Sequence, residues 1–258
     1  MTARAFSSVL ASCVRASCVC ASCVCAAAVV GLAGLLGGCI PSRGVVDATA
    51  ARSPSALFSV ATADSVVAFT FDDGPQPGNT DAVLDALAAH GARATFFLIG
   101  ERAVAHPGLV QRMADEGHEL GNHGWQLQMA ILLPAVRLRA DIARTDSVLR
   151  HVARPVWYRP SVGFYNRGVR WAAEAEGYRI ALGSIYTGDP QTQDVDLHVG
   201  HILKTIRPGD VVVLHDGIGD RVTAPAILER VLPELARRGY RFVTLSELAA
   251  LGSPASRR

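Results

Sequence analysis

The sequence contains no cysteine beyond residue 39, since all six cysteines lie in the first 39 of its 258 residues. The rest of the chain therefore has neither a disulfide framework nor a thiolate metal site. A charge bias is also missing. Two of the 25 basic residues precede residue 39 and all 23 acidic residues follow it, so the body of the chain is formally neutral. A neutral body argues against a nucleic-acid partner, which would require a large basic patch.

Nucleotide-binding motifs are lacking as well. Neither a P-loop nor a glycine-rich dinucleotide fingerprint follows the first strand-like run, so the sequence does not support nucleotide chemistry. The length of 258 residues suits one large domain or two small ones.

The first 38 residues have the features of a lipoprotein signal peptide. Positive charge is confined to residues 1–15, and residues 16–38 are uncharged and largely apolar. Leu36-Gly37-Gly38-Cys39 resembles a bacterial lipobox. The resemblance implies cleavage before Cys39, lipidation of that cysteine and attachment to a membrane outside the cytoplasm. Ordinary secretion and an uncleaved anchor remain alternatives, because the apolar stretch is long enough to span a bilayer.

The boundaries of the folded part follow from composition. Residues 39–64 contain scattered small polar residues and two prolines without clear periodicity, which predicts a flexible tether. Residues 252–258 predict a frayed, disordered tail. We therefore expect a single domain over residues 65–251.

Within this domain, apolar strand-like runs alternate with helix-like segments. Because strands that alternate with helices are parallel and carry the helices outside, the pattern predicts an α/β fold, either a barrel or an open doubly wound sheet. The expected strands are Val66–Phe71, Ala94–Ile99, His118–His123, Val156–Tyr158, Arg179–Leu182, Val211–Leu214 and Arg241–Thr244. The expected helices are Asp81–His90, Pro107–Glu116, Pro134–Val152, Gly168–Glu176, Leu197–Ile206 and Ala224–Arg238.

The first of these strands ends in two adjacent carboxylates, Asp72 and Asp73, followed by Gly74-Pro75. Consecutive strand residues point to opposite faces, so the two carboxylates can share a site only where the strand ends. Such a pair can divide labour, one carboxylate holding a cation and the other taking a proton. A turn with an aspartate cap is the alternative for this motif alone.

Other strands also end in polar residues. His123 ends the third strand, Arg159 the fourth, and His215 with Asp216 the sixth. In barrels and open α/β sheets alike, sites form at the carboxyl ends of parallel strands. We therefore expect these side chains to converge with the Asp72–Asp73 pair, although Asp216 alone is equally well explained as a cap.

Four segments together resemble the polysaccharide deacetylase family, also called the NodB-homology domain or carbohydrate esterase family 4. They are TFDDGP (70–75), GHELGNH (117–123), RPSVG (159–163) and VVVLHD (211–216), and the resemblance spans about residues 66–248. It implies a distorted (β/α)7-type barrel of parallel strands. It also implies metal-assisted removal of an acetyl group from an N-acetylated polysaccharide or oligosaccharide.

The resemblance assigns roles to five side chains. Asp73 and His123 match metal ligands, and Asp72 matches the general base that deprotonates a metal-bound water. Arg159 matches the residue that orients this base, and His215 matches the general acid that protonates the departing amine. Zinc is the expected metal, with cobalt or nickel as alternatives, because a divalent cation can lower the pKa of bound water from about 15.7 to about 7.

Two further residues match the substrate side of the family's site. The backbone N–H of Val162 corresponds to a donor to the oxyanion, which the tetrahedral intermediate requires. Leu214 corresponds to the wall of an acetyl pocket.

The sequence departs from the family at the metal site. The family supplies a second histidine four residues after the first, and here that position is Leu127, which cannot bind a cation. A catalytic zinc site generally has three protein ligands and a water. Gln126 and Gln128 carry carbonyl oxygens, though these are weak zinc ligands.

A second departure lies in the loop that contains Tyr186 and Asp189, within GSIYTGDP. The family normally has a Trp–Asp pattern there that tunes the catalytic histidine, and Tyr186 stands in place of the tryptophan. Asp189 can complete the metal site or pair with His215. Both residues are candidates for substrate binding.

Three other histidines are interpreted as structural. His118 lies an odd number of residues before His123 and so points to the opposite face of the strand. His198 and His201 share a helix face, but no carboxylate completes a site, which indicates a solvated face.

The leading hypothesis is therefore an envelope-anchored hydrolase that removes N-acetyl groups from an amino-sugar polymer. The alternative from another class is a catalytically silent, carbohydrate-binding lipoprotein that keeps the fold without a functional metal, and Leu127 is the residue that separates the two. A third possibility is hydrolysis of O-acetyl esters by the same groups.

Overall fold

The computed structural model describes residues 40–217 and 223–252. Cys39, the leader and all of the predicted tail at 252–258 except Gly252 lie outside these residues. Within them, no helix combines the length and the apolar character needed to cross a membrane.

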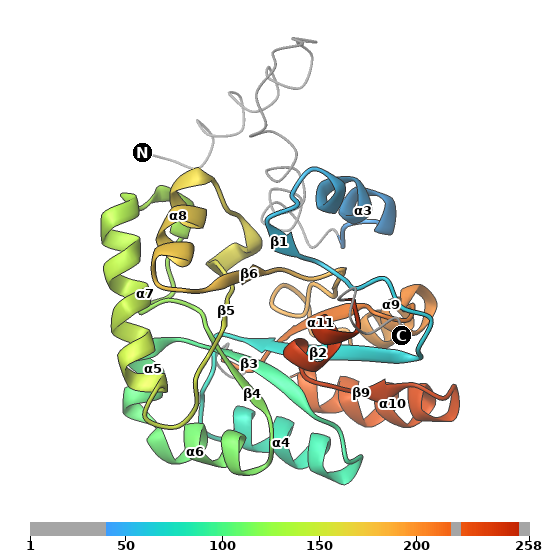
Figure 1. The fold of residues 1–258 in the computed structure, drawn as a ribbon. Helices are drawn as coiled ribbons and strands as arrows, with labels where there is room; N and C mark the ends of the chain where they lie inside the picture. The colour runs from blue at the N-terminus through green and yellow to red at the C-terminus, as the bar shows by residue number, and fades with distance from the viewer. Residues whose placement is uncertain (1–39, 218–222, 253–258) are drawn as a thin grey trace, which may run out of the picture.

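The strands form one sheet in which every pair of neighbouring strands is parallel (Figure 1). The order is β1-β6-β5-β4-β3-β2-β8-β7, and β9 also pairs with β2. The bounds are β1 Ala56–Leu57, β2 Val66–Asp72, β3 Ala94–Leu98, β4 Glu119–Asn122, β5 Trp157–Tyr158, β6 Arg179–Ala181, β7 Ile185–Tyr186, β8 Val211–His215 and β9 Arg241–Phe242.

Helices follow the strands and cover the outside of the sheet (Figure 1). The α-helices are α3 Arg43–Ala51, α4 Asn79–Ala89, α5 Gly100–Ala105, α6 Pro107–Asp115, α7 Ala135–Leu149, α8 Arg167–Ala175, α9 Val195–Thr205, α10 Ala224–Arg237 and α11 Leu245–Leu251. Two short 3-10 helices, η1 Ala130–Leu132 and η2 Ser161–Gly163, lie in loops. The predicted alternation of parallel strands and outer helices, and with it the distorted barrel, is confirmed.

Strand β2 lies at the centre and is buried along its whole length. Val67, Phe69 and Phe71 pack in the apolar cluster that the outer helices α4 and α10 share. Val66 and Ala68 instead join a cluster with residues of α11. Because side chains alternate along a strand, Thr70 and Asp72 point the same way as this second set, into the barrel.

The prediction of a flexible tether at 39–64 is wrong for the described residues 40–64. This segment forms α3 and the short strand β1, which pairs with β6. Phe58 and Val60 are buried, and Nη1 of Arg43 lies 2.7 Å from the buried Asp210 carboxylate. The segment gives a weak sequence signal because α3 buries few side chains and β1 has only two residues. The domain therefore begins before residue 65.

The amino-terminal end of the barrel is closed by α11, which the sequence pattern did not predict. Thr244 and Glu247 form a capping box at its start. Leu245 and Leu248 are fully buried inside the barrel end. Leu245 and Leu248 thus fill the barrel interior at this end, and Asp72 and His215 lie at the opposite end, where β2 and β8 finish.

Candidate active site

Asp72 and Arg159 form a buried ion pair at the carboxyl end of the strands. Nη1 of Arg159 donates to Oδ1 of Asp72 and to Oγ1 of Thr70, each at 2.7 Å. Its Nε and Nη2 donate to the carbonyls of residues 181 and 182, at 3.2 and 3.0 Å. The guanidinium also lies 4.0 Å from the centre of the Phe97 ring. Arg159 thus has a fixed position, and it orients the Asp72 carboxylate by a charge-assisted hydrogen bond.

Asp73 and His123 lie side by side next to this pair. Oδ1 of Asp73 is 3.3 Å from Nε2 of His123, and both side chains are nearly fully buried. Burial favours the protonated carboxyl, but His123, with smaller contributions from His215 and Arg102, outweighs it and lowers the pKa of Asp73 to about 2. Asp73 is therefore an anion at neutral pH, although its buried Oδ1 accepts no hydrogen bond from the part of the chain that the structure describes.

The geometry of Asp73 and His123 fits two ligands of one cation. Metal–oxygen and metal–nitrogen distances near 2.0–2.2 Å place neighbouring donor atoms about 3.0–3.4 Å apart, and the observed separation is 3.3 Å. Among the described residues, however, no group of three or more His, Cys, Asp or Glu side chains could hold a metal ion. The site therefore fits a divalent cation with two protein ligands.

The neighbours of the missing ligand do not replace it. Leu127 is 57% exposed. The amide nitrogen of Gln126 donates to Glu101 at 3.1 Å, and that of Gln128 donates to Asp141 at 2.8 Å. The amide nitrogens of both glutamines are thus hydrogen-bonded to carboxylates.

His215 pairs with Asp189. The Asp189 carboxylate lies 3.0 Å from Nδ1 of His215 and also accepts the backbone N–H of His215 at 2.8 Å. Burial disfavours the imidazolium, but Asp189, with help from Asp73 and Asp72, outweighs it and raises the pKa of His215 to about 10. Of the two alternatives for Asp189, the structure shows the pairing with His215. The carboxylate is buried there, and a direct contact of Asp189 with substrate stays a prediction.

The loops after β2 and β8 interlock. A Cβ added at Gly74 would lie 2.5 Å from the Asp216 carboxylate, and one at Gly217 would lie 2.1 Å from the Asp73 carbonyl oxygen. Nη1 of Arg102 donates to the carbonyls of Asp73 and Gly217. These contacts fix the position of Asp73 relative to His215, since His215 is the last residue of β8 and directly precedes the second loop.

Asp216 is buried and accepts a 2.6 Å hydrogen bond from the Thr80 hydroxyl, whereas the loop that it was alternatively expected to cap continues into residues 218–222, outside the described residues. Burial raises its pKa to about 7; the Thr80 hydrogen bond opposes the rise, and the charges of Asp73 and Asp72 add to it.

The expectation that Leu214 lines an acetyl pocket is wrong. Leu214 is fully buried in the cluster that the outer helices share, on the opposite face of β8 from His215. The same alternation puts Val213, two residues before His215, on the inner face.

Val162 and Tyr186 are placed close to the Arg159 end of the site. Val162 is 46% exposed and has φ 61°, a left-handed conformation that is uncommon for a β-branched residue. The Tyr186 hydroxyl accepts the backbone N–H of Gly183 at 3.0 Å, and burial raises the pKa of this phenol. Val162 therefore has the exposure that a substrate contact requires, whereas the Tyr186 hydroxyl already accepts a hydrogen bond from the protein backbone.

Two of the three histidines that were interpreted as structural, His118 and His198, are buried. Nδ1 of His118 accepts the backbone N–H of Ala94 at 3.2 Å, which agrees with a structural role. The prediction of a solvated face for His198 and His201 is wrong for His198, which is fully buried and bonded to backbone carbonyls.

Sequence reasoning missed Thr70, Arg102 and Thr187. Thr70 was detectable, because it lies two residues before Asp72 on the inner face of the same strand. Arg102 acts through a contact to a distant segment and gives no local signal, and the hydrogen bond from Thr187 to Asp189, two residues away, is not distinguished by the sequence alone.

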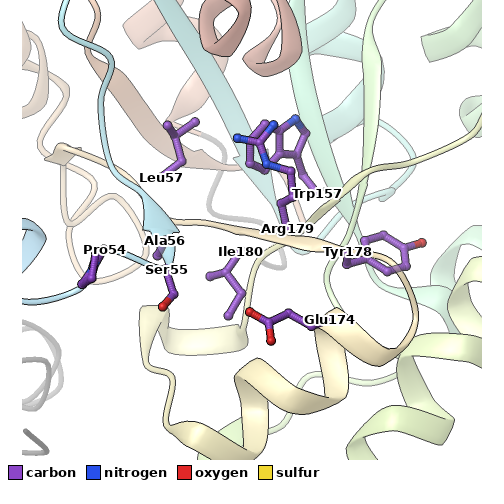
Figure 2. Close-up of a pocket in the computed structure, with 9 residues that line it drawn as sticks. All are labelled: Pro54, Ser55, Ala56, Leu57, Trp157, Glu174, Tyr178, Arg179 and Ile180. Atoms are coloured by element: carbon purple, nitrogen blue, oxygen red, sulfur yellow. The ribbon is translucent and has the colours of Figure 1, made fainter. Parts of the chain in front are cut away.

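A pocket unrelated to these groups lies at the other end of the barrel (Figure 2). It is lined by Trp157 and Arg179, the first residues of β5 and β6, together with Glu174 and neighbouring residues. The Arg179 guanidinium stacks 4.2 Å from the Trp157 ring. None of the residues that converge around Asp73 contributes to it.

Comparisons with known proteins agree with this arrangement. A sequence model of the polysaccharide deacetylase family matches residues 59–181. A peptidoglycan-N-acetylglucosamine deacetylase of Bacillus cereus is 41% identical over 189 residues, which cover 72% of this chain and 88% of that protein.

Solved structures give the same result. A peptidoglycan N-acetylglucosamine deacetylase in complex with 4-naphthalen-1-yl-N-oxidanyl-benzamide has a TM-score of 0.71 and 33% identity, and the match covers 75% of this chain and 92% of that one. A family 4 acetyl xylan esterase from Clostridium thermocellum, in complex with a cobalt ion, has a TM-score of 0.66 and 30% identity over 72% of this chain and 91% of that one. The chain therefore belongs to the polysaccharide deacetylase family.

Proposed function

We propose that this protein is a hydrolase that removes N-acetyl groups from an amino-sugar polymer of a bacterial envelope. The observation that carries the proposal is the convergence of three pairs at one end of the barrel: Asp72 with Arg159, Asp73 with His123, and His215 with Asp189. The similarity to a peptidoglycan-N-acetylglucosamine deacetylase supports peptidoglycan as the polymer.

The pairs divide the work of amide hydrolysis. Asp72, oriented by Arg159, accepts the proton of the attacking water, and His215, kept protonated by Asp189, gives a proton to the departing amine. Asp73 and His123 would hold a divalent cation, which when bound makes water more acidic and polarises the acetyl carbonyl. The N–H of Val162, in its left-handed conformation, is the candidate donor to the oxyanion.

A second candidate function is hydrolysis of O-acetyl esters. The similarity to an acetyl xylan esterase favours it, because the same groups act on an ester with an easier leaving group. The silent, carbohydrate-binding alternative is favoured by Leu127 alone, since the acid–base pairs that a binding protein would not need are intact.

We place the enzyme outside the cytoplasm, held by a lipid on Cys39 after removal of residues 1–38. The lipobox-like sequence Leu36-Gly37-Gly38-Cys39 supports this location, and peptidoglycan is found there. Labelling of the wild type, but not of Cys39→Ser, by radioactive palmitate in a bacterial host is the expected result. Equal labelling of both would exclude this anchor.

The function is tested by acetate release from chitin oligomers, peptidoglycan and acetylated xylan, with zinc, cobalt or nickel supplied in turn. We expect release from the N-acetylated substrates that is abolished by a chelator and by Asp73→Ala. Release from acetylated xylan alone would support the esterase. Sugar binding without metal uptake or acetate release would support the silent alternative.

A further inference from the structure

The loop between β7 and α9 carries Asp189 and is held from behind by His198. His198 lies in the first turns of α9 and is fully buried. Its ring returns toward the preceding loop, where Nδ1 lies 3.0 Å from the Thr187 carbonyl oxygen and Nε2 lies 3.0 Å from the Thr192 carbonyl oxygen. One ring therefore joins the two ends of the segment 187–192, and Asp189 lies between those ends.

The chemistry of these two contacts is directional. A carbonyl oxygen only accepts hydrogen bonds, whereas each imidazole nitrogen donates only when it carries a proton. Every protonation state of the ring therefore makes at least one N–H···O bond to the loop, and the imidazolium makes both. No leucine or glutamine side chain can reproduce the pair, because leucine has no donor and glutamine has its donors on one atom.

A short series of contacts leads from His198 to His215. The Thr187 carbonyl faces His198, and the Thr187 hydroxyl donates to Oδ1 of Asp189 at 2.8 Å. Oδ1 and Oδ2 of Asp189 in turn face Nδ1 and the backbone N–H of His215. Thr187 is thus held on one side by His198 and holds Asp189 on the other.

We propose that His198 is a positioning residue for the Asp189–His215 pair. It touches no reacting group, and it acts by fixing the segment 187–192 so that the Asp189 carboxylate stays against the His215 ring. The kinetic consequence rests on the proposed deacetylase function, whereas the structural consequence does not.

The direct test follows the His215 ring by NMR titration in the metal-free protein, in the wild type, His198→Leu, His198→Gln and His201→Gln. His201 lies one turn further along α9 and is partly exposed, which makes it the matched control. We expect the pKa of His215 to fall by about one unit or more in His198→Leu and by less in His198→Gln, because a displaced Asp189 supports the imidazolium less. His201→Gln should titrate like the wild type.

Acetate release provides the second readout. In His198→Leu the alkaline limb of the pH–rate profile should move to lower pH by about one unit, so kcat near pH 10 should fall about fivefold while kcat at pH 8 and KM change little, as expected for weakened acid catalysis. A general loss of structure would instead lower the melting temperature without moving the limb.

An unchanged His215 titration in folded His198→Leu would overturn the proposal. If that variant does not fold, the same result in His198→Gln overturns it. If the wild type releases no acetate with any metal, the proposed function fails, and the titration still decides the role of His198.

Discussion

The two halves of the site differ in completeness. In the acid–base half, Asp72 has Arg159 and His215 has Asp189, and each pair is connected by hydrogen bonds of 2.7 to 3.0 Å. In the cation half, Asp73 and His123 lie 3.3 Å apart, and the buried Oδ1 of Asp73 and Nδ1 of His123 have no hydrogen-bond partner among residues 40–217 and 223–252. The acid–base half is a complete hydrogen-bond network, and the cation half consists of two side chains that are available as cation ligands.

This difference places the effect of the Leu127 departure in the cation half. The loss of a third ligand at Leu127 leaves the acid–base groups and their supports intact. We therefore propose that the chemistry of proton transfer is retained and that cation binding is the weak step. The predictions below separate the halves by changing one at a time.

The largest effect is expected at the general base. Asp72→Asn keeps the shape of the side chain and its contact with Arg159 but removes the group that accepts a proton, so acetate release should fall about 10²–10⁴-fold. Metal affinity, measured by calorimetry, should stay unchanged because Asp73 and His123 are untouched. Asp64→Asn, at an exposed position just before β2, is the control. Normal turnover by Asp72→Asn would remove Asp72 from the mechanism.

The next effect is on stability. Arg159→Met leaves the buried Asp72 carboxylate without its ion-pair partner and removes the donor to two carbonyls, which should cost about 3–5 kcal/mol in the free energy of unfolding. Denaturant titration measures the loss. Arg139→Met breaks a half-exposed pair with Glu176 and should cost less than about 1 kcal/mol. Equal costs in the two variants would show that the Arg159 network does not stabilise the acid–base half.

These contrasts also explain what the sequence could reveal. The runs that became β2, β3 and β8 are continuous, apolar and buried along their cores. Asp72 and His215 are the last residues of β2 and β8, and His123 and Arg159 directly follow β4 and β5. Such local patterns can be recognised in the amino-acid sequence alone. The convergence of these residues followed from the parallel order of the strands.

The rest depended on tertiary contacts. Strand β1 has two residues and owes its place to pairing with β6, so no local pattern distinguishes it from a tether. Arg102 reaches two carbonyls from separate loops, and His198 reaches back to residues that precede its own helix. Leu214 was assigned by motif resemblance, and strand alternation showed that it faces the helices.

The third prediction completes the cation half. Leu127→His places an imidazole at the position where the family has a ligand, and Leu127 is exposed, so the substitution should hardly change stability. Calorimetry should show cobalt or zinc binding about tenfold tighter or more, which corresponds to about 1.4 kcal/mol. Leu132→His, at another exposed leucine, is the control. An unchanged affinity would mean that residue 127 does not face the cation site.

The smallest expected effect is a shift in the pH dependence of acetate release. The pKa of His215 is raised to about 10 by Asp189 against the effect of burial, so the imidazolium persists across neutral pH and is lost only in alkali. Asp189→Asn should lower this pKa and move the alkaline limb of the acetate-release profile downward, with little change below pH 6, where His215 is protonated in both proteins. A limb that stays in place would mean that another group sets the alkaline loss.

The most direct measurement is the structure of a crystal soaked in cobalt chloride, with the ion located by anomalous scattering. The account predicts a cobalt ion about 2.0–2.2 Å from Oδ1 of Asp73 and Nε2 of His123, with the remaining positions filled by solvent. An Asp73–His123 contact without an ion, at a cobalt concentration that supports acetate release, would contradict it.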